Sequence, residues 1–125
     1  MSRILIVDDD QRIVQLLSDC FKHAYTVEVA MNAGEARAIV RRQRPDLVLL
    51  DLMLPGVSGM HLLKEIKETD PTIAVVMVTG SNDVGLATEA VEHGAAAFVR
   101  KPFSLAHLDR LVTEVLAKSG TGDVP

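Results

Sequence analysis

The sequence predicts an α/β fold in which helices cover both faces of a five-stranded parallel sheet. Five short apolar runs recur along the 125 residues, at 4–7, 27–30, 47–50, 73–78 and 96–99. Most are continuously apolar instead of alternating, which is the pattern of strands buried on both faces. Helical segments separate them, and parallel strands need such right-handed crossovers. We therefore expect a three-layer, doubly wound sandwich with strand order 2-1-3-4-5.

The first two helices carry helical periodicity together with the signals of a helix start. We expect Asp10 to cap the first helix, with its carboxylate on the backbone N–H groups of that helix. Its apolar face repeats at spacings of three and four residues: Ile13, Leu16, Leu17, Cys20 and Phe21. The second helix follows Asn32, which stands three residues before Glu35 in the arrangement of a capping box.

The last three helices are bounded mainly by caps and turn-forming residues. The third is expected after Ser58 and must end before Pro71, because the residue preceding a proline disfavours helix. The fourth covers 86–92 and ends at Gly94, which readily adopts a left-handed conformation. The fifth starts at a Ser104 cap and continues its apolar period towards the end of the chain.

Length and composition predict one globular domain. The chain is 48% hydrophobic and 24% charged, a balance typical of folded proteins, and its length fits a single domain. Small and turn-forming residues, SGTGDVP, make up 119–125. We expect a domain over 1–118 and a tail or the start of a linker at 119–125.

Charge, hydropathy and cysteine content exclude several classes of function. No apolar run reaches the roughly 20 residues of a membrane span, and no signal peptide precedes the first strand, so we expect a cytoplasmic protein without membrane contact. The formal net charge of -4 gives no field that attracts nucleic acid, so direct DNA binding by this domain is not expected. The single cysteine, Cys20, is expected to be a buried, inert thiol.

Polar residues follow four of the predicted strands. Asp8 and Asp9 follow the first, Asp51 the third, Thr79 the fourth and Lys101 the fifth. Ligands bind at the carboxyl ends of such sheets, so these side chains should converge. A lone Asp after a strand is usually a cap and a lone Lys is usually solvated, but their joint placement favours a site. Carboxylates without His or Cys suit Mg2+, whereas the four scattered histidines show no zinc spacing.

Four motifs in this order resemble those of response-regulator receiver domains of two-component signalling: IVDDD, LLDLMLPGVSGM, VMVTGS and FVRKPF. The resemblance covers about residues 3–118, nearly the whole chain. It implies the CheY-like, flavodoxin-like form of the sandwich. Receivers themselves show the strand order predicted above, so the fold and family predictions are not independent.

The resemblance implies an aspartyl-phosphate site that uses Mg2+. Asp51 would be the phospho-acceptor and also a metal ligand. Asp9 would bind Mg2+ directly, Asp8 would help through water, and the backbone carbonyl of Met53 would supply another oxygen. Lys101 would contact the phosphoryl group. The donor would be a sensor histidine kinase or a histidine phosphotransfer protein.

The resemblance also implies a switch that reaches a distant face. Thr79 would move its hydroxyl onto the phosphoryl group, and Phe98 would rotate inward in response. The Lys101–Pro102 peptide bond would be cis. The face made by the fourth helix, the fifth strand and the fifth helix would then change and contact an output domain or a second copy. Small residues gather there, which fits either movement or simply tight packing.

Two other functions compete with the switch. A Mg2+-dependent phosphohydrolase with an aspartyl nucleophile is disfavoured, because Met53 stands where a second acid is expected two residues after Asp51 and no cap insertion is present. An inactive interaction module with the same fold is disfavoured by the intact set of acids, Thr79 and Lys101. We expect a regulatory domain whose chemistry is limited to its own phosphorylation and dephosphorylation.

Overall fold

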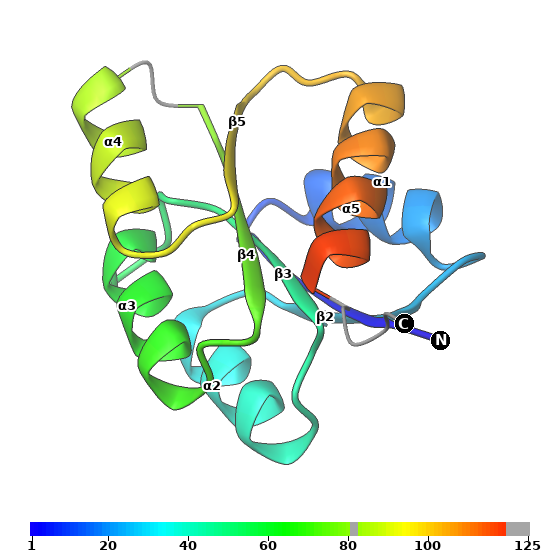
Figure 1. The fold of residues 1–125 in the computed structure, drawn as a ribbon, viewed down its shortest axis with the longest axis horizontal. Helices are drawn as coiled ribbons and strands as arrows, with labels where there is room; N and C mark the ends of the chain where they lie inside the picture. Colours follow the sequence, from blue (N-terminus) through cyan, green and yellow to red (C-terminus); the bar gives the residue numbers. More distant parts are fainter. Residues whose placement is uncertain (81–82, 120–125) are drawn as a thin grey trace.

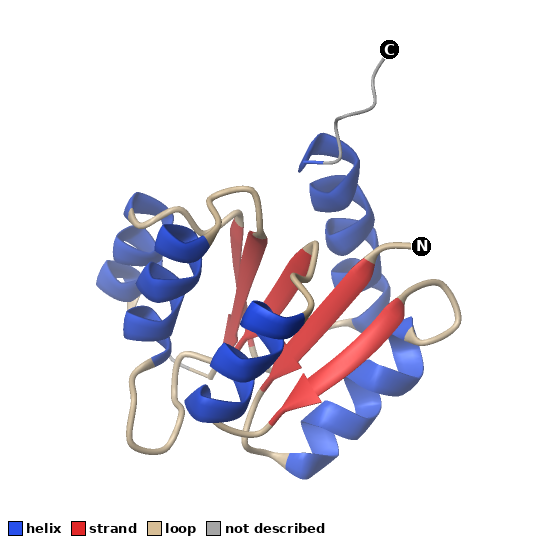
Figure 2. Cartoon of the chain, turned by 90° about the horizontal axis from the view of Figure 1, so that it is seen from below, coloured by secondary structure: helices blue, strands red, loops and turns tan. Residues whose placement is uncertain are grey.

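Strands and helices alternate strictly along the chain (Figures 1 and 2). The computed structural model describes residues 1–80 and 83–119. Within them the strands are β1 (Arg3–Val7), β2 (Thr26–Ala30), β3 (Leu47–Leu50), β4 (Ala74–Thr79) and β5 (Ala97–Arg100). The helices are α1 (Gln11–Phe21), α2 (Ala33–Arg42), α3 (Gly59–Thr69), α4 (Val84–Glu92) and α5 (Leu105–Ser119). All strand pairs are parallel in the order β2-β1-β3-β4-β5, which confirms the predicted fold class and strand order.

Helices cover both faces of the sheet, and each face has its own core. α1 and α5 lie on one face, and α2, α3 and α4 lie on the other (Figure 1). Leu5 and Val7 pack under the α2–α3–α4 layer, whereas Ile4 and Ile6 pack under α1 and α5. Because neighbouring residues of a strand face opposite sides, a strand between two helical layers must be apolar throughout.

Several element boundaries differ from the expected ones by one or two residues. β4 begins at Ala74 instead of Ile73, because the Ile73 N–H donates to the Asp70 carbonyl and closes the preceding turn. β5 is likewise shifted by one residue. α4 begins earlier, at Val84, because Asp83 is its N-cap and accepts a hydrogen bond from the Gly85 N–H at 2.8 Å.

The predicted helix caps at Asp10, Asn32, Ser58 and Ser104 are confirmed. The capping box is modified, because the Glu35 carboxylate accepts from the Met31 N–H at 2.8 Å and not from Asn32. The apolar face expected for α1 is wrong at Leu16, which is 43% exposed. The predicted Leu17 and Phe21 are buried together with Val14, and Ile13 and Cys20 are partly buried against the same core, so only Leu16 lies beyond the edge of the buried stripe.

Two further expectations concern the ends and the membrane. No helix among the described residues is long and apolar enough to cross a bilayer. Ser119 is the last residue of α5, and the rest of the expected tail, 120–125, lies outside the described residues. Cys20 is partly buried against the α1–α5 core, and burial raises the pKa of its thiol, with a smaller contribution from Asp109. The expectation of a buried thiol is thus met only in part, and the raised pKa agrees with an inert cysteine.

Candidate functional site

The carboxyl ends of four strands bring the predicted site residues to one edge of the sheet. Val7 pairs with Leu50, so the residues that follow them, Asp8 and Asp51, lie side by side. The Asp51 N–H donates to the Val7 carbonyl at 2.9 Å, which holds the start of the following loop. The strand pairing thus places the acids that follow β1 and β3 next to each other.

The same register argument holds for β4 and β5. Thr79 pairs with Arg100, and the Lys101 N–H donates to the Thr79 carbonyl at 2.7 Å. Thr79 is fully buried at the end of its strand. The Lys101–Pro102 peptide bond is cis. Lys101 therefore leaves β5 directly beside the end of β4, with its side chain directed to the acids.

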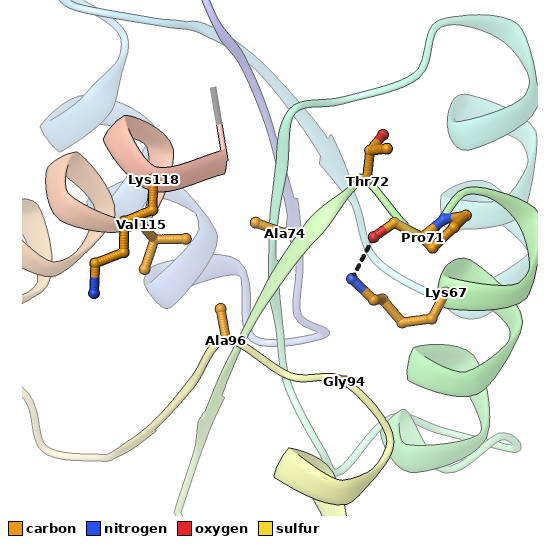
Figure 3. Close-up of a pocket in the computed structure, with 8 residues that line it drawn as sticks. All are labelled: Lys67, Pro71, Thr72, Ala74, Gly94, Ala96, Val115 and Lys118. Atoms are coloured by element: carbon orange, nitrogen blue, oxygen red, sulfur yellow. Dashed lines mark hydrogen bonds between the residues drawn. The ribbon is translucent and has the colours of Figure 1, made fainter. Parts of the chain in front are cut away.

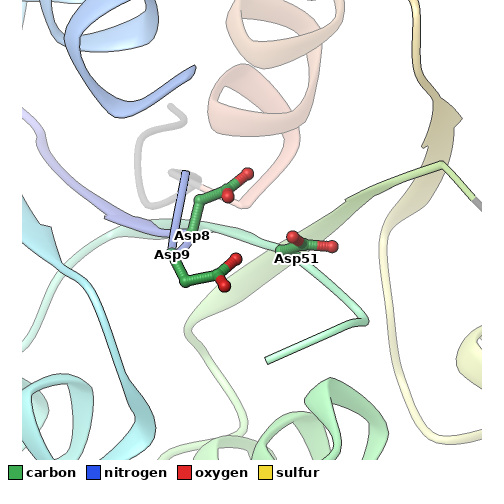
Figure 4. Close-up of side chains that lie close together, drawn as sticks. All are labelled: Asp8, Asp9 and Asp51. Atoms are coloured by element: carbon green, nitrogen blue, oxygen red, sulfur yellow. The ribbon is translucent and has the colours of Figure 1, made fainter. Parts of the chain in front are cut away.

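Three carboxylates gather at this edge (Figure 4). Asp8, Asp9 and Asp51 each offer an oxygen atom, and these oxygens all lie within 4.8 Å of one another. Asp8 is 3% exposed and Asp51 is 6% exposed, whereas Asp9 is exposed. Two unit charges about 4 Å apart repel by roughly 4 kcal/mol at an effective dielectric constant near 20. The cluster therefore needs positive charge.

Lys101 supplies part of that charge. Its ammonium lies 2.9 Å from Asp8 Oδ2 and 3.4 Å from Asp51 Oδ2. Burial lowers the pKa of Lys101, but the hydrogen bond to Asp8 and the charge of Asp51 outweigh that effect and the net pKa is raised. Lys101 thus stays protonated at neutral pH and bridges the two buried acids.

The negative charge that Lys101 does not compensate affects Asp51 most. Burial is the main cause that raises the pKa of its carboxyl group, and the charge of Asp8 adds to it. The Met53 N–H, which donates to Asp51 Oδ1 at 3.1 Å, and Lys101 oppose the shift without cancelling it. Ionised Asp51 is therefore held in an unfavourable environment that a further cation would relieve.

The donor set fits a hard divalent cation. Its three side-chain donors are carboxylate oxygens, and neither His nor Cys belongs to this cluster in the part of the chain that the structure describes. Mg2+ is bound in proteins by one or two carboxylates, waters and phosphate oxygens. Asp8, Asp9 and Asp51 could hold it, and the carbonyl of Met53 stays a predicted ligand. Zinc, which prefers nitrogen and sulfur, fits poorly.

A family model described as "Response regulator receiver domain" matches residues 4–113. The chain belongs to the response-regulator receiver family. Sporulation initiation phosphotransferase F of Bacillus subtilis is 38% identical to this receiver domain over 115 residues, which cover 91% of the chain and 93% of the relative. A solved CheY-like receiver domain from Methanospirillum hungatei JF-1 superposes with a TM-score of 0.94 at 31% identity and covers 98% and 99% of the two chains.

Some relatives are longer than this receiver domain. The phosphate regulon transcriptional regulatory protein PhoB of Pseudomonas aeruginosa is 36% identical over 123 residues, which are 96% of this chain and 54% of that protein. The receiver domain thus spans about half the length of this relative, as it does of the mycobacterial response regulators MprA and of the probable transcriptional regulatory protein TcrX of Mycobacterium tuberculosis.

Two features of the receiver site were missed from the sequence. Asp8 Oδ1 accepts a hydrogen bond from the Asp10 N–H at 2.9 Å, so Asp8 orients the turn after β1 as well as facing Lys101. Such a bond is an Asx turn, and an Asp two residues before a helix cap is its sequence signal. The second is the close backbone approach at Gly59, a residue that the sequence predicts only as part of the turn into the third helix: a Cβ there would collide with the Asp51 carbonyl and lie 2.6 Å from Leu52 Cα. Only glycine lets α3 begin this close to the strand end that carries Asp51.

Proposed function

We propose that this receiver domain is a phosphorylation-dependent switch in which Asp51 accepts a phosphoryl group. The donor is a phosphohistidine on a sensor histidine kinase or a histidine phosphotransfer protein. A carboxylate oxygen of Asp51 attacks the phosphorus, the P–N bond breaks, and its electron pair leaves with the imidazole. The observation that carries the proposal is the single ammonium of Lys101 that contacts both Asp8 and Asp51.

Lys101 and the acids have distinct roles in this proposal. Lys101 neutralises phosphoryl oxygens once Asp51 is esterified, because its ammonium already lies beside the Asp51 carboxylate. Asp9 is exposed and is proposed to bind Mg2+ directly. Asp8 is already bonded to Lys101 and to the Asp10 N–H, so it acts through a water. Bound Mg2+ supplies the positive charge that offsets the repulsion between phosphate and acids.

The switch is proposed to pass through Thr79 and Phe98. The new phosphoryl oxygens are strong acceptors, and we propose that the end of β4 shifts to bring the buried Thr79 hydroxyl to them. Phe98 is half-buried against the α2–α3–α4 core, and we propose that it rotates into the space that Thr79 leaves. A local change of charge at Asp51 then changes β5 and its neighbours.

The output is proposed to leave through the face made by α4, β5 and α5. α4 exposes Val84 at 78% and Val91 at 58%, which offers apolar surface to a partner. Among the small residues of this region, Ala90 and Ala95 are buried and serve packing, whereas Gly85 and Ala96 are exposed. We propose that residues 1–118 act in the cytoplasm as the signalling unit and that an output domain or a second copy binds this face.

The test is phosphorylation by a small phosphodonor. Wild type and Asp51→Asn are incubated with Mg2+ and acetyl phosphate, and an acid-stable, base-labile adduct is sought by intact mass spectrometry. We expect one adduct on wild type, none on Asp51→Asn, and an unchanged adduct on Asp46→Asn, which removes an exposed acid at the other end of β3. Omission of Mg2+ should greatly reduce the adduct.

Other outcomes would contradict the proposal in different ways. An equal adduct on Asp51→Asn would place the chemistry on another residue. Wild type that forms no adduct would instead be an inactive interaction module. Steady hydrolysis of phosphate monoesters by wild type would indicate the phosphohydrolase.

A further inference from the structure

A pocket of about 440 Å³ opens at the edge of the sheet opposite to the acids (Figure 3). It lies at the amino ends of β4 and β5, between the loop that follows α3 and the last turns of α5. Its lining residues are Lys67, Pro71, Thr72, Ala74, Gly94, Ala96, Val115 and Lys118. The volume is in the range of pockets that bind small molecules, and the small side chains of Ala74 and Ala96 keep its floor open.

The pocket is positively charged on a chain whose formal net charge is -4. Lys67 and Lys118 stand on opposite sides of it, and none of the described residues that line it is acidic (Figure 3). The nearby acid Asp70 is already engaged, since it accepts from the Thr72 hydroxyl at 2.6 Å and from Arg44 at 3.0 Å. An incoming anion would therefore meet the Lys67 ammonium without a competing carboxylate in the described part of the wall.

Lys67 is held in a position to bind such an anion. Its ammonium donates to the carbonyls of Pro71 and Ile73, both at 2.8 Å. An ammonium has three N–H groups, so one donor is left for a ligand. Burial lowers the pKa of Lys67 despite the charge of Asp70, which means that a bound anion would compensate the desolvated cation.

Gly94 keeps the space beside Lys67 open. Its φ of +101° favours glycine, and a Cβ at this position would lie 3.0 Å from Lys67 Cε. A larger residue would strain the backbone and push the lysine side chain. The position of Lys67 in the pocket therefore depends on Gly94, which the sequence predicts only as the end of the fourth helix.

We propose that this pocket binds a small organic anion, a carboxylate with a compact apolar body. The carboxylate would pair with Lys67, and Lys118 would approach from the rim. The apolar body would lie on Ala74, Ala96 and Val115. The site is separate from the acidic cluster, because β4 and β5 run from this pocket at their amino ends to Thr79 and Lys101 at their carboxyl ends.

Benzoate and its uncharged isostere benzamide are the probes. Each is titrated into the 15N-labelled chain, and the amide signals of Gly94 and Ala96 are followed by NMR. We expect saturable shifts with benzoate and binding at least about tenfold weaker with benzamide, since a charge-assisted hydrogen bond is lost. Equal binding of the two probes, or no saturable shift with benzoate, would overturn the proposal.

Three variants locate the site. Lys67→Met should lose benzoate binding, whereas Lys64→Met, which removes a lysine from the same helix outside the pocket, should keep it. Ala96→Leu fills the floor and leaves both lysines in place, so it should also lose binding even if Lys67→Met disturbs the loop. Asp51→Asn should bind benzoate like wild type. Unchanged binding by Ala96→Leu would show that benzoate lies elsewhere.

Discussion

The two edges of the sheet each hold an aspartate, and they hold it in opposite ways. At the carboxyl edge, Asp51 is 6% exposed, repelled by Asp8 and only partly compensated, and its pKa is raised. At the amino edge, Asp70 accepts from the Thr72 hydroxyl, the Thr72 N–H and Arg44, and its pKa is lowered to about 2. The same fold thus disfavours the ionised form of Asp51 and favours the ionised form of Asp70.

The difference separates chemistry from structure. A carboxylate whose hydrogen bonds are complete, such as Asp70, holds a turn together and has little to offer a ligand. A carboxylate without enough positive charge around it, such as Asp51, is stabilised when a cation binds beside it or when the carboxylate takes up a proton. A pKa shifted against the charged form of a group is therefore the better guide to a ligand site.

The largest expected effect comes from Lys101→Met. Removal of the ammonium leaves Asp8 and Asp51 facing each other without a counter-charge, because Lys101 is the bridge between them. We expect a loss of about 3 kcal/mol in the free energy of unfolding in EDTA, from urea titration, since breaking a buried ion pair strands its partners. Added Mg2+ should recover part of it by binding the folded state.

A surface pair provides the control for that measurement. Lys22→Met removes a lysine that lies 3.2 Å from Asp19 with both side chains about half exposed. Solvent screens this pair, so we expect stability within error of wild type. If Lys101→Met lost as little unfolding free energy as Lys22→Met, the two buried acids would not depend on Lys101 for charge compensation.

At the amino edge, Asp70→Asn should cost about 1 kcal/mol at pH 7, less than the roughly 2 kcal/mol that the pKa shift allows, because solvent screens the group and Asn still accepts hydrogen bonds. A carboxyl group whose pKa is lowered in the folded state stabilises the fold at pH values above its ordinary pKa of 3.8, and this stabilisation is lost as the pH falls towards 2. The wild-type advantage should therefore shrink on acidification in urea titrations. Glu68→Gln, an exposed acid on α3, is the control, and a pH-independent difference for Asp70→Asn would contradict this account.

The fold was predictable because its signals are local and repeated. A continuously apolar strand such as β3 can lie only between two helical layers, and strand order then gathers the acids at one edge. The errors came from features that a pattern does not contain. The exposure of Leu16 depends on how much of α1 the sheet covers, and the start of β4 depends on the Ile73 hydrogen bond. The amino-edge pocket joins Lys67, Ala96 and Lys118, none of which has an unusual local sequence.

Asp51→Asn should change stability in the opposite direction from Asp70→Asn. Without divalent cations at pH 7, the variant removes a charge that burial and Asp8 disfavour, so we expect its free energy of unfolding to rise above that of wild type. Because the Asp51 pKa is raised in the folded state, folded wild type takes up a proton on Asp51 at a higher pH than the unfolded chain does. Wild type therefore regains stability as the pH falls, and its difference from Asp51→Asn in unfolding free energy shrinks. Thermal unfolding from pH 7 to about pH 4 measures it.

Mg2+ gives the matching control for Asp51→Asn. Because the variant lacks one proposed ligand, Mg2+ should stabilise wild type more and reduce or reverse the difference in unfolding free energy. A variant that is less stable than wild type in EDTA at pH 7 would show that Asp51 is structurally satisfied, like Asp70.

The smallest effect is expected at Asp10, which divides the three consecutive aspartates into two kinds. Asp10 accepts a hydrogen bond from the Arg12 N–H at 2.9 Å and caps α1, whereas Asp9 is a proposed metal ligand. Asp10→Ser keeps a capping oxygen, so stability should stay within error of wild type and Mg2+ affinity, measured by calorimetry, should change by less than about twofold. Asp9→Ala should abolish Mg2+ binding. Equal losses of affinity in the two variants would mean that net charge alone, and not the position of each carboxylate, attracts the cation.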